Sequence, residues 1–509
     1  MINITPILRA YGALALRRYS KASCVAHQKR VLFSLLRRAA GTKFGKEHGF
    51  KSIHDVKAYQ SRVPIRRYEE FWSEYWQKDF PVLDNITYWG TVPYFAVTSG
   101  TTTGKTKYIP YTKEMIRANN RAGLALLSSF ALENPSSAIW GGKSFVLGGS
   151  TDLVREADGI YSGDLSGIVT KTIPRWCKGR YFPPEEIAFL SDWEKKIDHM
   201  AEASLKEDIR SLAGVPSWLL ILFEKLREKT GKERLAEIYP RLELIIHGGV
   251  KFDPYRPVFE RYLLGSNIKL REVYPASEGF IAFQDSAQKC GLRLIVNNCI
   301  FYEFVPLEEI DKENPTRHWI EDAEPGVNYA LVMTTAAGLW SYVIGDTVRF
   351  IDNAKERIEI TGRISYSLSA FGEHLIGEEI EEALTKAGED LGFSLLEYSV
   401  GALFPSKGGE LGRHVYILEV ESKYKLDSEA VSQQIDSYLS KINDDYAAHR
   451  ADGFGMASPK VVLVKRGTFA EWMKSRGKLG GQNKVPRIIN DVNLLENLLN
   501  FIQTRGDKM

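Results

Sequence analysis

The sequence predicts an α/β protein made of a large N-terminal domain and a smaller α+β C-terminal domain. With 509 residues, the chain is too long for one hydrophobic core, so at least two domains are expected. Between residues 91 and 362, short apolar strand candidates alternate with helix candidates, which is typical of α/β architecture. The pattern changes after Gly362. We therefore predict a boundary near residues 362–367, with domains of residues 1–363 and 364–509.

The N-terminal domain is predicted to begin with helices over residues 1–75. A strand over 91–97 and another that starts at 107–109 flank a short polar loop, and a helix is expected over 113–133. Apolar runs and helical periodicity indicate the elements that follow. The expected strands are 145–147, 242–246, 294–296, 328–334 and 340–344, and the expected helices are 194–212 and 218–229.

The C-terminal domain is predicted to be a compact α+β unit. The Gly-rich stretch 407–412 indicates a hairpin turn. The expected strands are 398–403, 414–419 and 460–464, and the expected helices are 378–386 and 428–443.

The composition narrows the class of protein. Hydrophobic residues make up 44% and charged residues 26% of the chain, as in soluble globular proteins. The formal net charge of +3 gives no basis for binding nucleic acid or a membrane through charge alone. No run of about 18 apolar residues occurs, so no transmembrane segment is expected. The four cysteines lack CxxC spacing, which argues against a zinc site and favours reduced thiols in a cytoplasmic protein.

The N-terminal segment is basic and contains no Asp or Glu before Glu47. Such a segment resembles a transit peptide. The alternative is a helix docked on the body of the protein, with Val31, Leu32, Leu35 and Leu36 facing inward at helical spacing. We favour the docked helix, because the pattern continues into the following sequence without a break.

The stretch VTSGTTTGKTKYIP at residues 97–110 is a candidate phosphate site. Its glycines allow the backbone to curl so that N–H groups converge on an anion. Hydroxyl side chains add neutral donors, and Lys105 and Lys107 add positive charge. A Walker A loop requires four residues between its glycines and a helix after them, whereas Gly100 and Gly104 have three residues between them and Pro110 follows. A plain Ser/Thr-rich hairpin is the alternative.

Three further motifs carry chemistry. In VYPASEG at residues 273–279, an aromatic ring precedes a carboxylate by four residues, and Mg²⁺ favours one or two carboxylates together with phosphate oxygens. In YVIGD at 342–346, Asp346 follows a strand and could accept both hydroxyls of a ribose. The segment GGQNKVPR at 480–487 places Lys484 close to the end of the chain. Each motif alone also fits an ordinary turn or a basic tail.

The order and spacing of these motifs resemble the adenylate-forming superfamily. Several stretches are similar to the acyl-acid amido synthetases, which conjugate plant hormones to amino acids. They are VTSGTTTGKTKYIP, VYPASEG, YVIGD, the N-terminal AAGTKFGKEHGF and VPIRRYEEF, and the late GTFAEWMKSRGKLGGQNKVPR. The resemblance covers essentially the whole chain. It implies an adenylating N-terminal domain, with α/β sheets and a β-barrel part, and a small mobile C-terminal domain that carries Lys484.

The resemblance also implies a ligase that uses ATP and Mg²⁺. A small carboxylic acid attacks the α-phosphate to give acyl-AMP and pyrophosphate, and an amine such as an amino acid then takes the acyl group. No nucleic acid partner is implied. Two other functions stay open, namely transfer of the acyl group to coenzyme A and nucleotide binding without turnover. The acid, the amine and the oligomeric state are not defined by the sequence.

By similarity, each motif is expected to take one role in this reaction. The catalytic residues are expected to be Lys484 on the α-phosphate and carboxylate, Arg363 near the ribose, and Glu278 on Mg²⁺. The residues expected to hold ATP are Ser99, Gly100, Thr101, Thr102 and Lys105 on the phosphates, Gly248 and Gly249 beside adenine, Tyr274 stacked on adenine, Ser277 on the nucleotide and Asp346 on the ribose.

Some positions depart from the family pattern or fit two roles. Val343 stands where the family commonly has Arg, and Ser365 stands where a hinge Asp or Lys is common. Lys478 lies six residues before Lys484 and could compete for its role. An apolar group on the helix at 218–229 could line the acid pocket or form helix core, and we favour core. This group is Trp218, Leu219 and Phe223.

Overall fold

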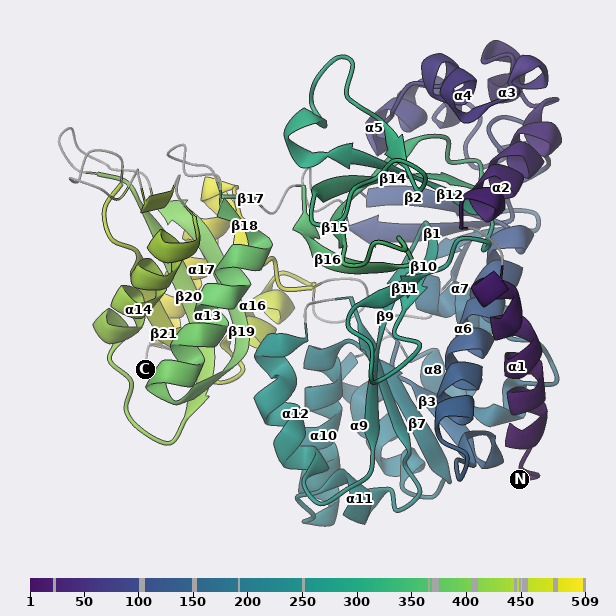
Figure 1. Ribbon diagram of the computed structural model, residues 1–509. Coiled ribbons are helices and arrows are strands. Elements are labelled where there is room, and N and C mark those ends of the chain that lie inside the picture. Colours follow the sequence, from purple (N-terminus) through teal and green to yellow (C-terminus); the bar gives the residue numbers. More distant parts are fainter. Residues whose placement is uncertain are drawn as a thin grey trace. The chain divides into compact units, whose positions relative to one another are not determined.

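The structure is a computed structural model that describes residues 1–21, 24–99, 106–148, 153–190, 193–249, 252–364, 367–368, 375–403, 411–443, 446–447, 450, 456–478 and 484–506. The chain forms two compact units (Figure 1). The first contains residues 1–250 and 263–360, and the second contains residues 251–262 and 361–509. The boundary between residues 363 and 364 stays a prediction. It would leave residues 251–262 in the N-terminal domain, whereas they pack with the second unit.

A twelve-stranded sheet is the framework of the first unit. Five neighbouring strands at one end are parallel, and the other described pairings are antiparallel. In spatial order the strands are β13 (His318–Trp319), β12 (Ile300–Pro306), β14 (Asn328–Thr335), β15 (Tyr342–Phe350), β16 (Arg357–Arg363), β11 (Leu292–Leu294), β10 (Gly279–Phe283), β9 (Lys269–Ala276), β8 (Leu244–Gly248), β7 (Ile209–Gly214), β3 (Lys143–Val146) and β6 (Tyr181–Phe182). The order does not close on itself, so the β-barrel that the resemblance implied is not found among the described strands.

Helices cover both faces of the parallel part of this sheet. On one side, α1 (Thr5–Lys21) packs on α6 (Lys113–Glu133); on the other, α9 (Trp193–Ser204) packs on α10 (Pro216–Thr230) (Figure 1). The side chain of Thr112 caps the first turn of α6. Parallel strands expose apolar residues on both faces, so they require this cover. The other α-helices of this unit are α2 (Cys24–Ala39), α3 (Lys43–Glu47), α4 (Val56–Arg62), α5 (Tyr68–Phe71), α7 (Leu165–Thr172), α8 (Glu185–Ala188) and α11 (Leu235–Ile238).

One predicted helix is partly wrong. The sequence indicated a helix over 194–212, but α9 ends at Ser204 and residues Ile209–Gly214 form strand β7. The polar residues between these two elements make the turn, and β7 then pairs in parallel with both β3 and β8. In a strand of six residues, the pattern of apolar side chains is too short to be distinguished from the end of the preceding helix. Pairing with the neighbouring strands therefore decides its structure.

The basic helix α2 is docked on the body of the first unit, as predicted. The Gln28 side chain is fully buried; its amide nitrogen donates to the carbonyls of Val296 (2.7 Å) and Ile300 (2.9 Å), and its oxygen accepts from the Tyr302 backbone N–H (2.8 Å). These bonds offset the cost of removing the amide from water. Of the residues predicted to face inward, Val31 is half-buried and the buried ones are Leu32, Leu35 and Leu36.

A separate four-stranded sheet holds the predicted phosphate stretch. Its order is β2 (Thr106–Tyr111), β1 (Tyr94–Ser99), β5 (Ile160–Gly163) and β4 (Leu153–Ala157). β1 and β2 pair antiparallel as far as Ser99 opposite Thr106. The two strands predicted on either side of the loop are therefore confirmed.

The second unit is a four-stranded sheet between two pairs of helices (Figure 1). One face packs on α13 and α14, and the other packs on α16 and α17. The strands are, in order, β21 (Lys460–Val464), β20 (Arg413–Ser422), β19 (Phe393–Leu403) and β22 (Ile488–Ile489). The helices are α12 (Arg256–Leu263), α13 (Gly377–Leu391), α14 (Ser428–Ile442), α16 (Thr468–Ser475) and α17 (Val492–Arg505), and β17 (Ser367–Leu368) pairs with β18 (Leu375–Ile376).

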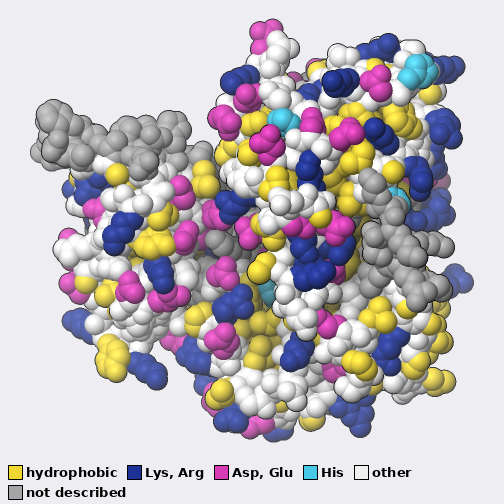
Figure 2. Space-filling view, in the orientation of Figure 1, with side chains coloured by type: hydrophobic (Ala, Val, Ile, Leu, Met, Phe, Trp, Pro, Cys, Tyr) yellow, Lys and Arg dark blue, Asp and Glu magenta, His cyan; other side chains and the backbone are white. Residues whose placement is uncertain are grey.

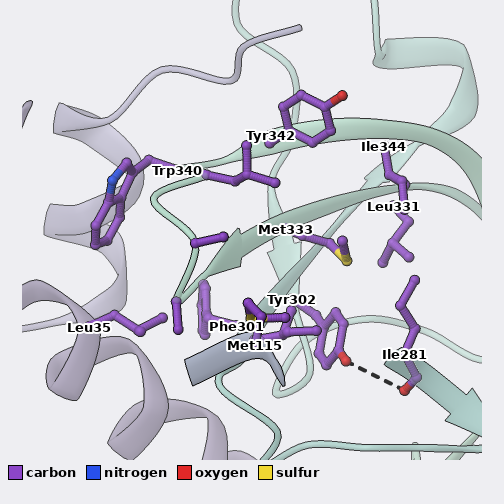
Figure 3. Packing of buried hydrophobic residues seen from close by; sticks show 14 of the residues in the cluster. Leu35, Met115, Ile281, Phe301, Tyr302, Leu331, Met333, Trp340, Tyr342 and Ile344 are labelled. Carbon is purple, nitrogen blue, oxygen red and sulfur yellow. Dashed lines mark hydrogen bonds between the residues drawn. The ribbon is translucent and has the colours of Figure 1, made fainter. Parts of the chain in front are cut away.

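The core of the first unit joins the N-terminal helices to the antiparallel strands. In Figure 3, Leu35 of α2 and Met115 of α6 lie beside Phe301, Met333 and other strand residues. Large apolar contacts of this kind are the main stabilising term for a domain of this size. On the face drawn in Figure 2, basic and acidic side chains are interspersed over each unit. None of the helices within the described ranges combines the length and the apolar character that crossing a bilayer requires.

Candidate nucleotide site

The loop end of the β1–β2 hairpin is held by α5. The Tyr68 hydroxyl accepts a hydrogen bond from the Tyr108 backbone N–H (2.8 Å). Lys107 Nζ lies 3.4 Å from Glu69 Oε1 and 5.2 Å from the centroid of the Tyr68 ring. Burial raises the pKa of Tyr68 to about 12, so this hydroxyl stays neutral at physiological pH. Lys107, predicted as mobile positive charge, is thus directed to a carboxylate beside the hairpin.

Most of the predicted phosphate residues follow Ser99 in the sequence. Ser99 is the last residue of β1. The other predicted phosphate residues lie outside the described part of the chain, and they are Gly100, Thr101, Thr102 and Lys105. Their role stays a prediction. The described flanks show that any loop here must join two antiparallel strand ends, which is not the strand-to-helix turn of a Walker A loop.

A tight turn between β9 and β10 presents Ser277 and Glu278. Ala276 pairs with Gly279, so only these two residues form the turn, and each is 9% exposed. Glu278 is hydrogen-bonded by the Tyr342 hydroxyl. Burial and this carboxylate hold the pKa of Tyr342 well above its usual range, so the phenol is a permanent donor to Glu278. Figure 3 shows the Tyr342 hydroxyl directed away from the other labelled core residues.

Tyr274 and Asp346 form a second contact between the same two segments. The Tyr274 hydroxyl donates to Asp346 Oδ2 at 2.6 Å. Asp346 lies at a β-bulge of β15, where the register against β14 shifts and Gly345 has φ +96°. A positive φ favours glycine, and a bulge redirects the next side chain. Tyr274 is only 5% exposed, so the stacking on adenine predicted for it stays a prediction.

These two contacts require the sheet to curl. β9 and β15 are separated by β10, β11 and β16, and four spacings of about 4.8 Å would put them roughly 19 Å apart in a flat sheet. A tyrosine and an aspartate cannot bridge that distance. The antiparallel half of the sheet is therefore strongly bent without closing, and the bend brings residues 274–278 against residues 342–346.

Gly248 is required by the close approach of the neighbouring strand β9. A Cβ on Gly248 would lie 2.2 Å from the carbonyl oxygen of Val273, its partner on β9. The neighbouring Gly249 is exposed and has φ +85°, so it makes the turn at the end of β8. The predicted approach of adenine to these two glycines stays a prediction.

The remaining predicted residues, Arg363 and Lys484, belong to the second unit. Arg363 is the last residue of β16 and is half-buried. Lys484 is exposed, and three residues separate it from β22. The chain after Lys484 is fixed to β19: the Ser399 hydroxyl donates to the Pro486 carbonyl, and the Val400 N–H donates to the Arg487 carbonyl, both at 2.7 Å.

Sequence reasoning missed Tyr68, Glu69 and Tyr342 as parts of this region. Tyr342 stands inside the quoted YVIGD motif, and its position four residues before Asp346 matches that of Tyr274 before Glu278. That equal spacing was the one available signal. Tyr68 and Glu69 stand inside VPIRRYEEF, a stretch similar to the family, but no local pattern links them to a hairpin about 40 residues later.

The arrangement supplies the groups that a nucleotide site needs. Asp346 is a carboxylate for hydroxyls, Glu278 is a carboxylate for a hard cation, and a hydroxyl- and glycine-rich hairpin lies in the same unit. A single carboxylate fits Mg²⁺, which takes its other ligands from phosphates and water. The strand-end turns and the curled sheet thus bring together groups of the kinds that an adenylate site requires, and the site itself stays a prediction.

Comparison with known proteins agrees with this class. Three models of one family match the sequence: the GH3 family N-terminal domain over residues 18–160 and 143–268, its central domain over 293–363, and its C-terminal domain over 378–493. The chain belongs to the GH3 family.

Individual relatives are distant but cover nearly the full length. The indole-3-acetic acid-amido synthetase GH3.4 of Arabidopsis thaliana is 22% identical, over 91% of this chain and 89% of the relative. The jasmonoyl–L-amino acid synthetase JAR4 of Nicotiana attenuata is 20% identical, over 92% and 91%. The solved structure of AtGH3.15 acyl acid amido synthetase in complex with 2,4-DB has a TM-score of 0.81 at 18% identity, over 97% of this chain and 96% of that one. At this identity the structural likeness shows a shared fold.

Proposed function

We propose that this protein is an acyl acid amido synthetase. It would use ATP to activate a small carboxylic acid as an acyl-adenylate and then transfer the acyl group to an amino acid. Membership of the GH3 family and relatives named for this activity support the proposal. The observation that carries it is the contact of residues 274–278 with residues 342–346, which puts the Glu278 and Asp346 carboxylates on facing segments.

In the first step an oxygen of the substrate carboxylate attacks the α-phosphorus, and the bond to the β-phosphate breaks to release pyrophosphate. An anion thus approaches an anion, so positive charge and dipoles must be in place beforehand. Lys484 would supply that charge at the α-phosphate, and Asp346 would hold the ribose. Tyr274 keeps the Asp346 carboxylate oriented through its 2.6 Å hydrogen bond.

In the second step the nitrogen of the amine attacks the acyl carbonyl, and AMP leaves with the electrons of the broken C–O bond. The proton of the attacking amine is lost to solvent or a base. Mg²⁺, when bound, would neutralise charge on the phosphates, and Glu278 is the residue that would hold it. The Tyr342 phenol fixes the Glu278 carboxylate from the side of the core.

The two relatives described above are named for different acids, so the acid is to be found by experiment. Pyrophosphate release is measured with ATP and Mg²⁺ over indole-3-acetic acid, jasmonic acid, 2,4-DB and simple aromatic and aliphatic acids. The best acid is then incubated with each amino acid and, separately, with coenzyme A, and products are identified by mass.

An amide product supports the proposal, and pyrophosphate release that is lost in Asp346→Ala places the reaction at this site. A thioester product without any amide would establish the coenzyme A ligase instead. No acid-dependent pyrophosphate release with any acid would reject both and favour a nucleotide-binding protein without turnover.

A further inference from the structure

A buried charged cluster in the second unit surrounds Arg487. The Arg487 side chain is 7% exposed; Nη1 lies 3.0 Å from Glu381 Oε1, and Nη2 lies 3.6 Å from Glu397 Oε1. The guanidinium also lies 4.6 Å from the centroid of the Tyr398 ring. Tyr398 closes the cluster by donating its hydroxyl to Glu381 at 2.9 Å.

The cluster is close to electrically neutral. Burial raises the pKa of Glu397 to about 7 despite the attraction of Arg487, so this carboxyl is partly protonated at physiological pH. Arg487 therefore pairs mainly with Glu381, the closer of the two carboxylates. Burying charges is costly unless they are paired and hydrogen-bonded, and each of these groups has a partner. A cluster of this kind holds its members in one geometry.

Arg487 is three residues from Lys484 and lies in the segment that is bonded to β19. Its own carbonyl accepts from Val400 N–H, and β22 continues beside β19 from Ile488. Both the backbone and the side chain of Arg487 are therefore fixed. With only two residues between them, the position of Lys484 relative to the second unit depends on Arg487.

Arg487 also contacts a segment from a different part of the chain. Its Nη2 donates to the Tyr255 hydroxyl at 2.7 Å. Tyr255 is 1% exposed and belongs to residues 251–262, which pack with the second unit although they lie between β8 and β9. This segment follows Gly248 and Gly249 in the sequence and leads toward β9, which contains Tyr274 and is followed by the turn with Glu278.

We propose that Arg487 is a positioning residue for adenylation, which fixes the Lys484 segment to residues 252–262. The inference rests on the proposed function, because Lys484 acts in this way only if acyl-adenylate is formed. Three covalent links join the units, at residues 250–251, 262–263 and 360–361. Two of these links are the two ends of residues 251–262, the segment that Arg487 contacts through Tyr255. Lys484 and these two links therefore belong to one connected element.

The test compares Arg487, which is buried, with Arg450, a half-buried arginine of the same unit. Arg450 forms a two-armed pair with Asp436 (2.7 and 2.6 Å) and donates to the Met456 carbonyl (2.9 Å). It contacts neither Lys484 nor residues 252–262 in any described interaction. Arg487→Met and Arg450→Met should both lower the thermal midpoint. Tyr255→Phe, which removes one hydroxyl only, is the milder variant if Arg487→Met does not fold.

Each variant is assayed with the best acid from the panel in two half-reactions: acid-dependent ATP–pyrophosphate exchange, and amine attack on the synthetic acyl-adenylate. For Arg487→Met we expect kcat of exchange to fall about 100-fold, in line with loss of one preorganised charge, with KM for ATP within about 2-fold. Amine attack should change by less than about 5-fold. Tyr255→Phe should lower exchange about 5-fold, and Arg450→Met should leave both half-reactions within about 3-fold of wild type.

Hydrogen exchange of backbone amides supplies a readout that needs no acid. Arg487→Met and Tyr255→Phe should both speed exchange in residues 252–262 and at β22, and Arg450→Met should not. Equal losses in Arg487→Met and Arg450→Met, or equal losses in both half-reactions, would overturn the inference. Wild-type protein that protects these amides but shows no pyrophosphate exchange with any acid would instead mean that the proposed function fails.

Discussion

The two regions that the proposed reaction would use are built in opposite ways. In the first unit, the residues proposed for the nucleotide have positions that follow from a curled sheet: Tyr274 in β9, Glu278 in the turn after it, and Tyr342 and Asp346 on β15. In the second unit, Lys484 is exposed, and the neighbouring chain is fixed by strand pairing and a buried arginine.

This difference indicates a division of labour. The curled sheet makes a site that is preorganised whatever the second unit does, because both contacts lie within one unit. Lys484 belongs to the other compact unit, so we propose that its charge is supplied for one step and withdrawn for the other. Changes in the first region should impair binding and both steps, whereas changes in the second should separate the steps.

The largest expected effect is that of Lys484→Ala. Removing the ammonium should reduce acid-dependent pyrophosphate exchange by roughly 10²–10³ or more, because the α-phosphate loses charge stabilisation in the transition state. Amine attack on synthetic acyl-AMP should be spared. The control is Lys478→Ala, which keeps exchange if Lys484 is the acting lysine. Equal loss of both half-reactions in Lys484→Ala would reject the division of labour.

Glu278→Gln should come next. An amide keeps the shape of the side chain and can still accept from Tyr342, but it is a weaker ligand for Mg²⁺. We expect exchange to fall about 100-fold and the Mg²⁺ concentration for half-maximal rate to rise several-fold. Titration with Mg²⁺ and with Mn²⁺ measures this. An unchanged metal dependence would remove Glu278 from the metal site.

Tyr274→Phe tests the orientation of Asp346. Loss of the hydroxyl removes a hydrogen bond to a charged group, worth about 1.5–3 kcal/mol, so KM for ATP should rise about 10-fold with a smaller change in kcat. Combined with Asp346→Asn, the effect should be less than additive because the two residues share one interaction. Additive effects would show that they act separately.

The sequence predicted the elements of both regions and much less of their contacts. The helix at 113–133 coincides with α6, and the strands around the phosphate stretch match β1 and β2. Local pattern suffices there, since capping and alternation are read within a few residues. The contact of Tyr274 with Asp346 depends on how far a sheet bends, and the position of residues 251–262 depends on packing with strands more than 100 residues later. Neither leaves a local pattern.

The smallest expected effect concerns stability and comes from Glu397. Its pKa is raised by burial from the ordinary value of 4.5 to about 7, so the folded state binds this proton more tightly than the unfolded state. Stability is therefore fully present below pH 4.5 and decreases as pH rises toward about 7. At about 1.4 kcal/mol per pKa unit, the difference of about 2.5 units is worth at most roughly 3 kcal/mol.

Glu397→Gln carries no titrating proton, so the variant should lack this part of the pH dependence. We expect nearly equal protection of the β19 amides in variant and wild type at pH 5, and slower exchange in the variant at pH 8 by about 1–3 kcal/mol in opening free energy, after correction for the intrinsic pH dependence. Glu419, whose pKa is also raised by burial, keeps its contribution in both proteins and cancels in the comparison. Equal pH dependence of the two proteins would mean that Glu397 is ionised in the folded state, and that Arg487 is held by two full charges.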